Sequence, residues 1–199
     1  MMPRFAIDVV ILPPEPVMDL ALSWNQQLSG QGNQSIILNK TDTLPHISLL
    51  MGCVTGDQLP NASRILNEFA QLSRALSLSV PGLRTLEGSH PVVALDISLS
   101  TDLLEFQRAM VEAFRPWITQ DAGDTDLFDP PPADPSVLTW INQFIPEQCG
   151  EKFWPHITLG HGRPLSAQKA FTFSGARLAI CHLGHHCTCR HVLAEAILK

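Results

Sequence analysis

The chain contains one pattern twice, first as Pro45-His46-Ile47-Ser48-Leu49 and later as Pro155-His156-Ile157-Thr158-Leu159. Both copies lie in runs rich in isoleucine, leucine and valine, which indicate β-strands. A glycine follows each copy closely, Gly52 in the first case and Gly162 in the second. We therefore expect two related strands, one from each half of the chain.

Side chains alternate between the two faces of a strand, so the repeated pattern separates polar from apolar residues. His46 and Ser48 share one face, while the residue between them and the residue after them are apolar and point into a core. The second copy repeats the arrangement with His156 and Thr158. If the two strands lie side by side across a pseudo-twofold axis, two imidazoles and two hydroxyls meet at one patch. We predict a catalytic site there.

The composition is that of an ordinary globular protein. The chain has 199 residues, of which 45% are hydrophobic and 16% are charged, so we expect one bilobed domain over residues 1–199. The apolar stretch Phe5–Leu12 is short, contains Asp8 and ends at Pro13, which favours a first strand over a signal peptide or a membrane span. Five cysteines are an odd number and fit reduced thiols better than a disulfide framework. We expect a cytoplasmic monomer without a membrane partner.

The formal net charge of −6 disfavours binding to long nucleic acids, which depends on a basic surface. A small nucleotide or a short RNA end fits this charge as a substrate. Acidic residues gather in the segment 120–135, where they alternate with Gly123 and a run of prolines. The aspartates are Asp121, Asp124, Asp126, Asp129 and Asp134. We interpret this acidic, proline-rich segment as a surface loop, a solvated insertion within the domain.

Hydrophobic periodicity predicts an α+β fold rather than a series of parallel βαβ units. Helices are expected over residues 15–28, 59–76, 103–116 and 135–144. Besides the two motif strands, strands are expected over residues 4–12, 35–39, 77–83, 91–99, 171–183 and 188–198. The last two would form a closing pair joined through Gly184, His185 and His186.

Cleavage of a phosphodiester needs a base to activate the attacking oxygen and an acid to protonate the leaving oxygen. An unperturbed imidazole has a pKa of about 6.5, so His46 and His156 can divide these roles near neutral pH. Ser48 and Thr158 would donate hydrogen bonds to the non-bridging phosphate oxygens as charge develops on them. This chemistry requires no metal and no cofactor. Which histidine is the base depends on how the substrate lies in the cleft.

Two motifs of the form His-apolar-[Ser/Thr]-apolar, at residues 46–49 and 156–159, lie about half a chain apart. In this respect the chain resembles the two-histidine (2H) phosphoesterase superfamily, which includes the bacterial RNA 2′,3′-cyclic phosphodiesterases, also called 2′-5′ RNA ligases. The resemblance implies two pseudo-symmetric lobes with antiparallel sheets around a central cleft and helices outside. It also implies a role in RNA processing, with hydrolysis of a 2′,3′-cyclic phosphate on a nucleotide or RNA end, or of a 2′-5′ linkage.

Further residues near the second motif are candidates for contact with the substrate. Trp154, with Phe153 beside it, could stack a base as aromatic side chains do in nucleotide sites, and both residues also suit a core. Many members of the family carry an arginine where this chain has His161, and Arg163 follows shortly after. His161 and Arg163 are close enough to the strand end to reach a phosphate, or else they lie in a solvated loop.

Two other functions stay open from the sequence alone. The chain could be a non-catalytic nucleotide-binding module, although both histidine motifs are intact. It could also be a zinc-binding interaction protein, because cysteines and histidines crowd the C-terminal stretch: Cys181, His182, His185, His186, Cys187, Cys189 and His191. Zinc would need Cys187 and Cys189 together with His182 or His185. The spacing matches no common zinc motif, and strand alternation would instead place Cys187, Cys189 and His191 on one face of a half-buried hairpin.

Overall fold

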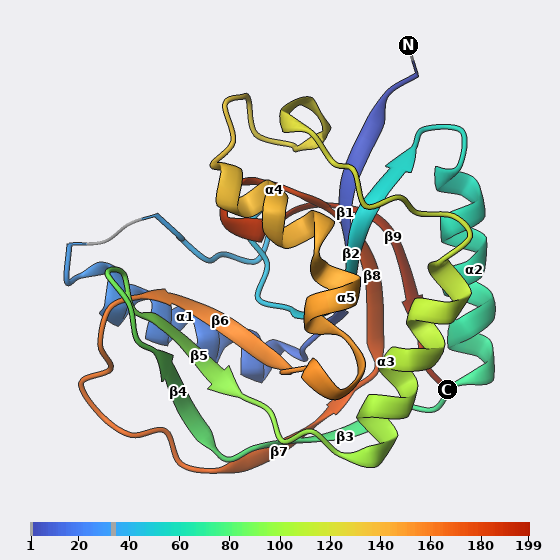
Figure 1. Ribbon diagram of the computed structural model, residues 1–199. Coiled ribbons are helices and arrows are strands. Elements are labelled where there is room, and N and C mark those ends of the chain that lie inside the picture. The colour runs from blue at the N-terminus through green and yellow to red at the C-terminus, as the bar shows by residue number, and fades with distance from the viewer. Residues whose placement is uncertain (1, 33–34) are drawn as a thin grey trace.

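The computed structural model describes residues 2–32 and 35–199, and it confirms the α+β class with antiparallel sheets (Figure 1). The strands are β1 (Arg4–Leu12), β2 (Ile47–Thr55), β3 (Leu76–Val80), β4 (Gly82–Leu86), β5 (Val92–Asp96), β6 (His156–His161), β7 (Phe171–Gly175), β8 (Arg177–Leu183) and β9 (Cys189–Ile197). The helices are α1 (Glu15–Ser29), α2 (Leu59–Leu72), α3 (Thr101–Phe114), α4 (Pro135–Asn142) and α5 (Phe144–Gln148). Within the described part of the chain, no helix is long and apolar enough to cross a membrane.

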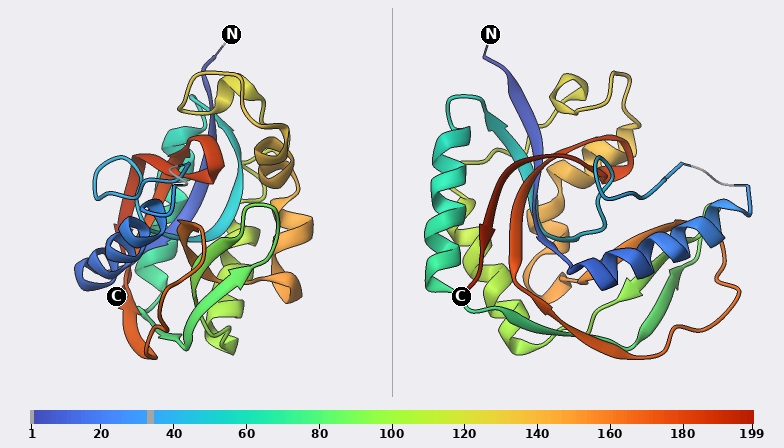
Figure 2. Two further views of the ribbon diagram at one scale, coloured as in Figure 1. Left: turned by 90° about the vertical axis from the view of Figure 1, so that its left-hand side faces the viewer. Right: turned by 180° about the vertical axis from the view of Figure 1, so that it is seen from behind.

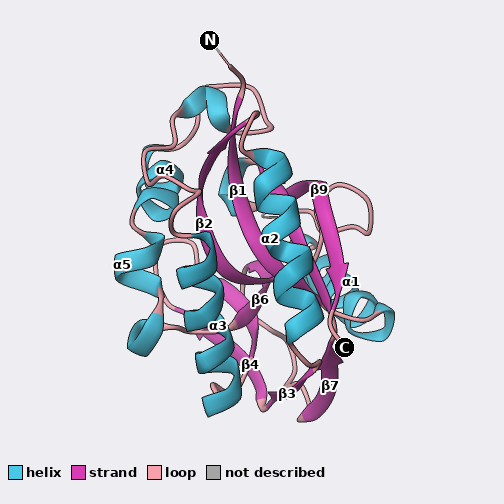
Figure 3. Ribbon diagram, turned by 90° about the vertical axis from the view of Figure 1, so that its right-hand side faces the viewer, coloured by secondary structure: helices cyan, strands magenta, loops and turns pink. Residues whose placement is uncertain are grey.

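Two sheets divide the molecule into two lobes. The first lobe is built on the sheet β2-β1-β8-β9 and the second on the sheet β4-β5-β6, while the pair β3-β7 lies where the chain passes between them. Neighbouring strands are antiparallel throughout these sheets. Helices α2 and α3 pack against the first sheet and α1 packs against the second (Figure 2 and Figure 3). The motif strands β2 and β6 are edge strands of their sheets and contact each other.

Each motif strand is covered by a helix that belongs to the other half of the sequence. Helix α1 precedes the first motif but packs against β6, which carries the second motif. Helix α3 precedes the second motif but packs against β2, which carries the first. The motif strand of each half is therefore covered by a helix from the other half, and these contacts link the two sheets.

A β-bulge interrupts both motif strands at the same place. In the first sheet Val9 pairs with Leu50 and Val10 pairs with Ser48, so Leu49 is an extra residue in β2. In the second sheet the register shifts in the same way next to Thr158. There Leu159 is the extra residue. A bulge leaves the extra residue outside the ladder and re-aims its neighbours.

A buried amide side chain satisfies the carbonyl of each extra residue. Gln107 of α3 donates from Nε2 to the Leu49 carbonyl at 3.1 Å. Asn25 of α1 donates from Nδ2 to the Leu159 carbonyl at 2.8 Å. Both amides are almost completely excluded from solvent. Because an unpaired buried carbonyl is costly, these two hydrogen bonds stabilise the bulges beside the motif residues.

Asn25 also explains why the strand expected over residues 35–39 is wrong. Ile36 and Leu38 are buried, as their alternation predicts, but these described residues form no strand. Nδ2 of Asn25 donates to the Ile36 carbonyl at 2.9 Å, and Oδ1 accepts from the Leu38 N–H at 2.9 Å. The Asn25 side chain thus supplies hydrogen bonds that a neighbouring strand would otherwise provide.

Two strands expected from the sequence are each broken into two. The strand expected over 77–83 is split at Pro81 into β3 and β4, because proline has no N–H for a ladder. The strand expected over 171–183 is split at Ala176 into β7 and β8, which pair with β3 and β1 respectively. The helix expected over 59–76 ends at Leu72.

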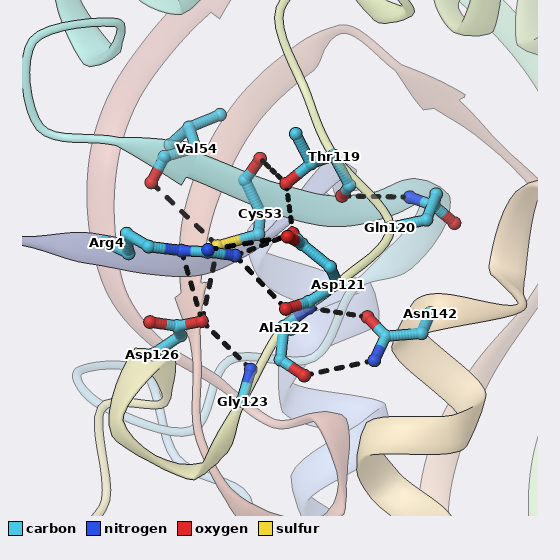
Figure 4. A network of polar contacts seen from close by, with 10 residues as sticks. All are labelled: Arg4, Cys53, Val54, Thr119, Gln120, Asp121, Ala122, Gly123, Asp126 and Asn142. Atoms are coloured by element: carbon cyan, nitrogen blue, oxygen red, sulfur yellow. Dashed lines mark hydrogen bonds and ion pairs between the residues drawn. The ribbon is translucent and has the colours of Figure 1, made fainter.

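The acidic segment 120–135 is fastened to the first lobe (Figure 4). Nη2 of Arg4 lies 2.6 Å from Oδ1 of Asp121, and Nε of Arg4 lies 3.4 Å from Oδ2 of Asp126. Asp126 also accepts the Gly123 N–H at 2.9 Å and is only 7% exposed. The interpretation as a solvated insertion is therefore wrong for Asp126. Its carboxylate can be buried because a guanidinium and a backbone donor meet it there.

Two further aspartates of this segment hold elements that line the cavity described below. Oδ2 of Asp129 accepts the His185 N–H at 2.7 Å and so fixes the turn His185–Cys187. Oδ1 of Asp134 accepts the Ser136 N–H at 2.8 Å and caps the N-terminus of α4.

The buried amides should contribute measurably to stability. We expect Asn25→Leu and Gln107→Leu each to lower the free energy of unfolding by about 1–3 kcal/mol, because each change removes the amide donor of a buried carbonyl, and only the weak Cys149 thiol contact at 4.0 Å then remains at Leu49. Urea denaturation measures this quantity. The matched control is Asn67→Leu on the exposed face of α2, which should change it by no more than about 0.5 kcal/mol. Equal effects at the three positions would contradict the role of the amides.

Candidate active site

The two motif strands meet at a cavity of about 380 Å³, a volume typical of small-molecule sites. All four polar motif residues line it: His46, Ser48, His156 and Thr158. Aromatic side chains form much of the remaining wall, namely Trp140, Phe144, Phe153 and Trp154. No lysine, arginine, aspartate or glutamate is among the described residues that line the cavity.

A backbone carbonyl orients each motif histidine. Nδ1 of His46 lies 2.7 Å from the carbonyl oxygen of Leu44, and Nδ1 of His156 lies 2.8 Å from that of Trp154. A carbonyl oxygen can only accept a hydrogen bond, so Nδ1 carries the proton in both rings. Nε2 is then the unprotonated nitrogen of each neutral imidazole and the atom that can exchange a proton with a substrate.

Trp154 supports His156 by stacking. The two rings lie 4.0 Å apart at their centroids and are inclined by only 14°. The indole is held in turn by a hydrogen bond from its Nε1 to Oδ1 of Asp96 at 2.7 Å, and the guanidinium of Arg84 lies 4.7 Å from the indole centroid. Trp154 therefore positions His156. Its contact with a base stays a prediction.

Burial favours the neutral form of both motif histidines. It lowers the pKa of His46 to about 4 and also lowers the pKa of His156. The Leu44 carbonyl partly opposes this effect at His46, whereas the charge of a protonated His156 reinforces it. The apolar wall of the cavity is the physical cause, because it cannot solvate an imidazolium.

An acidic residue, Asp8, adjoins the first motif. It lies in the middle of β1 and is fully buried, and Oγ of Ser48 donates to its Oδ2 at 2.6 Å. The same oxygen lies 3.7 Å from Nε2 of His46. Burial raises the pKa of Asp8 well above its usual value and lowers that of His46, so the uncharged pair is favoured over an ion pair.

The structure separates the two remaining substrate-binding candidates. His161 lines the cavity, and its Nδ1 lies 3.2 Å from the His90 carbonyl. Arg163 is exposed and is not among the described lining residues. It forms hydrogen bonds of 3.1 and 2.7 Å with the carboxylate of Glu87.

The C-terminal cysteines and histidines do not gather into a site of their own. Cys187 lies in the turn before β9 with a φ of 55°, so the expectation that it shares a strand face with Cys189 and His191 is wrong. Cys189 is buried and His191 is exposed, while Nε2 of His182 lies 2.8 Å from the Asp126 carbonyl. The described residues contain no close group of three metal ligands drawn from this run alone. All five cysteines are free thiols, as expected.

Some residues around the cavity were missed in the sequence. Asp8 is the one charged residue in the apolar stretch Phe5–Leu12. Because a charged residue is rarely buried without a partner, its position was a sign that it has a polar partner in the fold. Asn25 and Gln107 lie on helices far along the chain from the bulges that they support, Trp140 lies on α4, and no local pattern marks any of the three.

This fold, with two histidine motifs facing one cavity, is the architecture of a two-histidine phosphoesterase. A family model described as the 2′-5′ RNA ligase superfamily matches residues 39–177. The chain belongs to this family, and the resemblance of its motifs is thereby confirmed. Membership supports a phosphoesterase-type activity.

Solved structures of the same fold cover almost the whole chain. TT0787 of Thermus thermophilus aligns with a TM-score of 0.58 and 15% identity over 97% of each chain. E. coli LigT complexed with NADP+ aligns with a TM-score of 0.54 and 12% identity over 98% of each chain. A protein described as a phosphoesterase aligns with a TM-score of 0.52 and 11% identity over 98% of this chain and 99% of its own. At these identities the likeness establishes the fold alone. No curated protein sequence matches the chain.

The raised pKa of Asp8 gives a prediction about stability. The folded chain keeps this proton at pH values where the unfolded chain, with a pKa of 3.8 at this group, has released it. The stability linked to the proton is therefore complete below pH 3.8 and is lost as the pH rises through the folded pKa. An asparagine side chain has no such proton to release, so the Asp8→Asn variant should gain stability relative to the unmodified chain as the pH rises, with a limiting slope of about 1.4 kcal/mol per pH unit.

Urea denaturation in EDTA at several pH values measures this difference. Asp57→Asn, which removes an exposed carboxyl, is the matched control for the loss of one acidic group. A stability difference between Asp8→Asn and the unmodified chain that stays constant with pH would contradict the buried, protonated carboxyl.

Proposed function

We propose that the chain is a metal-independent phosphodiesterase that hydrolyses a 2′,3′-cyclic phosphate, carried by a nucleotide or an RNA end, or a 2′-5′ linkage. The observation that carries this proposal is the shared geometry of His46 and His156. Each ring has its Nδ1 tied to a backbone carbonyl, which leaves Nε2 as the unprotonated nitrogen, and both histidines line one common cavity. Two such nitrogens are what a paired acid and base require.

The cavity supports a small substrate with little charge. Its volume of about 380 Å³ suits a ligand of nucleoside size. Aromatic residues in the wall offer surfaces for a base, and the described lining holds no lysine or arginine to neutralise several phosphates. A cyclic phosphodiester carries a single negative charge, so it fits this lining better than a polyphosphate does.

The reaction would proceed by attack of water on phosphorus. Nε2 of one histidine takes a proton from the water, and Nε2 of the other donates a proton to the leaving ribose oxygen as the P–O bond breaks. Thr158 would donate its hydroxyl proton to a non-bridging oxygen. Ser48 can do the same when Asp8 is protonated, because the carboxyl then donates to Oγ and leaves the Ser48 proton free.

Ligands of a protein with the same fold agree with a nucleotide substrate. E. coli LigT has been solved in complex with NADP+ and with 3′-AMP. Both are adenine nucleotides. We expect the cavity of this chain also to bind a nucleotide, with Trp154 and His161 in contact with it. Arg163 would have to break its hydrogen bonds with Glu87 before it could reach the nucleotide.

The first test is hydrolysis of the four nucleoside 2′,3′-cyclic phosphates in EDTA, with separation of the 2′- and 3′-monophosphate products. We expect turnover to a single isomer. His46→Ala and His156→Ala should each lower kcat/KM by about 10²–10⁴, since each removes an acid or a base. Ser48→Ala and Thr158→Ala should cost less, about 10²-fold.

The matched control is His191→Ala, an exposed histidine that is not among the described lining residues; it should retain full activity. Full activity in either motif variant would contradict the mechanism. Binding of the cyclic nucleotides without turnover would instead favour a non-catalytic nucleotide-binding module.

The pH profile provides an independent prediction. The pH dependence of kcat/KM reports the pKa values of the free enzyme. The rate is highest where one histidine is neutral and the other is protonated. Burial lowers the pKa of both motif histidines below 6.5, that of His46 to about 4, so the maximum should lie below pH 6.5. Above the maximum the rate should fall as the protonated acid is lost. Rates from about pH 4 to about pH 9 measure this profile, and a maximum on the alkaline side of neutrality would contradict it.

A further inference from the structure

A compact group of potential metal ligands lies beside the first motif. Asp8 of β1, His46 just before β2 and Cys189 at the start of β9 each offer one ligand atom, and these atoms lie within 4.8 Å of one another. The Leu44 N–H donates to the Cys189 carbonyl at 3.1 Å, which ties the residue just before the first motif to β9. We propose that Asp8, His46 and Cys189 bind a zinc ion, and that this ion inhibits the hydrolysis proposed above.

An unsatisfied atom in this group points independently to a ligand. Oδ1 of Asp8 is buried and has no hydrogen-bond partner among the described residues. Leaving a buried acceptor unpaired costs about 1–3 kcal/mol. The ion pairs of the described residues offer this carboxyl no lysine or arginine, only His46. A bound cation would satisfy Oδ1 while Oδ2 keeps its hydrogen bond with Ser48.

The donor set fits zinc. Imidazole nitrogen, thiolate sulfur and carboxylate oxygen are all common zinc ligands, and three protein ligands with an open fourth position form a recurrent type of zinc site. Oδ2 of Asp8 lies 3.7 Å from Nε2 of His46, so a zinc ion bound to that nitrogen would lie beside the same carboxylate, whose other oxygen, Oδ1, would be the ligand. The Leu44 carbonyl on Nδ1 supplies the usual second contact of a metal-binding histidine.

The cavity gives the ion access. The side chain of His46 keeps 13% of its surface exposed and lines the cavity, whereas Asp8 and Cys189 are fully buried behind it. Zinc would approach from the cavity, take the lone pair of Nε2, and displace the thiol proton of Cys189 and the carboxyl proton of Asp8 to solvent. The fourth position would then face the substrate side.

Inhibition follows from the nitrogen atom to which zinc would bind. Nε2 of His46 is the nitrogen that the proposed mechanism uses for proton transfer. Once this lone pair binds zinc it can neither accept nor donate a proton. This part of the inference rests on the proposed function, whereas the binding of zinc does not.

Direct binding tests the site without any assay of activity. The full chain is stripped with EDTA, the chelator is removed, and Zn²⁺ affinity is measured by competition with a chromophoric chelator. Co²⁺ serves as a second probe, because its charge-transfer absorption reports a thiolate ligand. We expect one equivalent of zinc. Cys189→Ser should weaken binding at least tenfold, because loss of a ligand costs no less than loss of a residue that only hydrogen-bonds to a ligand, which is about tenfold or more. It should also abolish the thiolate absorption.

Cys53→Ser, at another buried cysteine, is the matched control and should bind zinc as the unmodified chain does. If Cys189→Ser does not fold, Asp8→Asn removes the carboxylate ligand with little change of shape and should weaken zinc binding in the same way. Absence of stoichiometric binding, or equal binding by Cys189→Ser and Cys53→Ser, would overturn the site.

The inhibition is tested with the cyclic phosphate assay. One equivalent of Zn²⁺ should lower the rate by about 10²-fold or more, and EDTA should restore it. Zinc that binds through Cys189 without slowing hydrolysis would overturn the inhibition. Zinc binding in a chain that hydrolyses none of the four cyclic phosphates would support the site and contradict the proposed function.

Discussion

The two amide-to-carbonyl hydrogen bonds at the bulges are the constraint on which the site depends. Gln107 meets the carbonyl of Leu49 and Asn25 meets that of Leu159. Gln107 lies on α3, in the second half of the sequence, and meets the motif strand of the first half. Asn25 lies on α1, in the first half, and meets the motif strand of the second half. The same contact therefore holds the bulge, aims the polar pair beside it and joins the lobes. A buried carbonyl without a donor would be expensive, so this arrangement has few alternatives.

The apolar character of the cavity sets its electrostatics. Because burial disfavours charge, both motif histidines are neutral and Asp8 holds its proton more tightly than an exposed carboxyl, with its pKa raised and theirs lowered. A phosphate anion entering the cavity would reverse this balance for one imidazole. The proposed substrate brings one such negative charge, and the proposed zinc ion would bind the lone pair of Nε2 and replace the protons of a thiol and a carboxyl.

Several local features were predictable and others were not. Strand β1, the apolar sides of β2 and β6, and the four polar motif residues follow from alternation and repetition alone. The segment 35–39 did not form the expected strand, because a single asparagine supplies the hydrogen bonds of a neighbouring strand. Asp126 is buried for a similar reason, since Arg4 meets it from a distant point in the chain. Composition cannot reveal such partners.

The sequence by itself determined the repeated motif and the α+β class and led to the prediction of paired-histidine chemistry, because these depend on side-chain alternation and on residue type. Only the tertiary structure decided where the chain passes between sheets, which helix covers which motif, and that Asp8 and Cys189 lie beside His46. These outcomes depend on contacts between segments far apart in the sequence. Their energies come from satisfying buried polar groups, and no local pattern encodes which distant residue will do so.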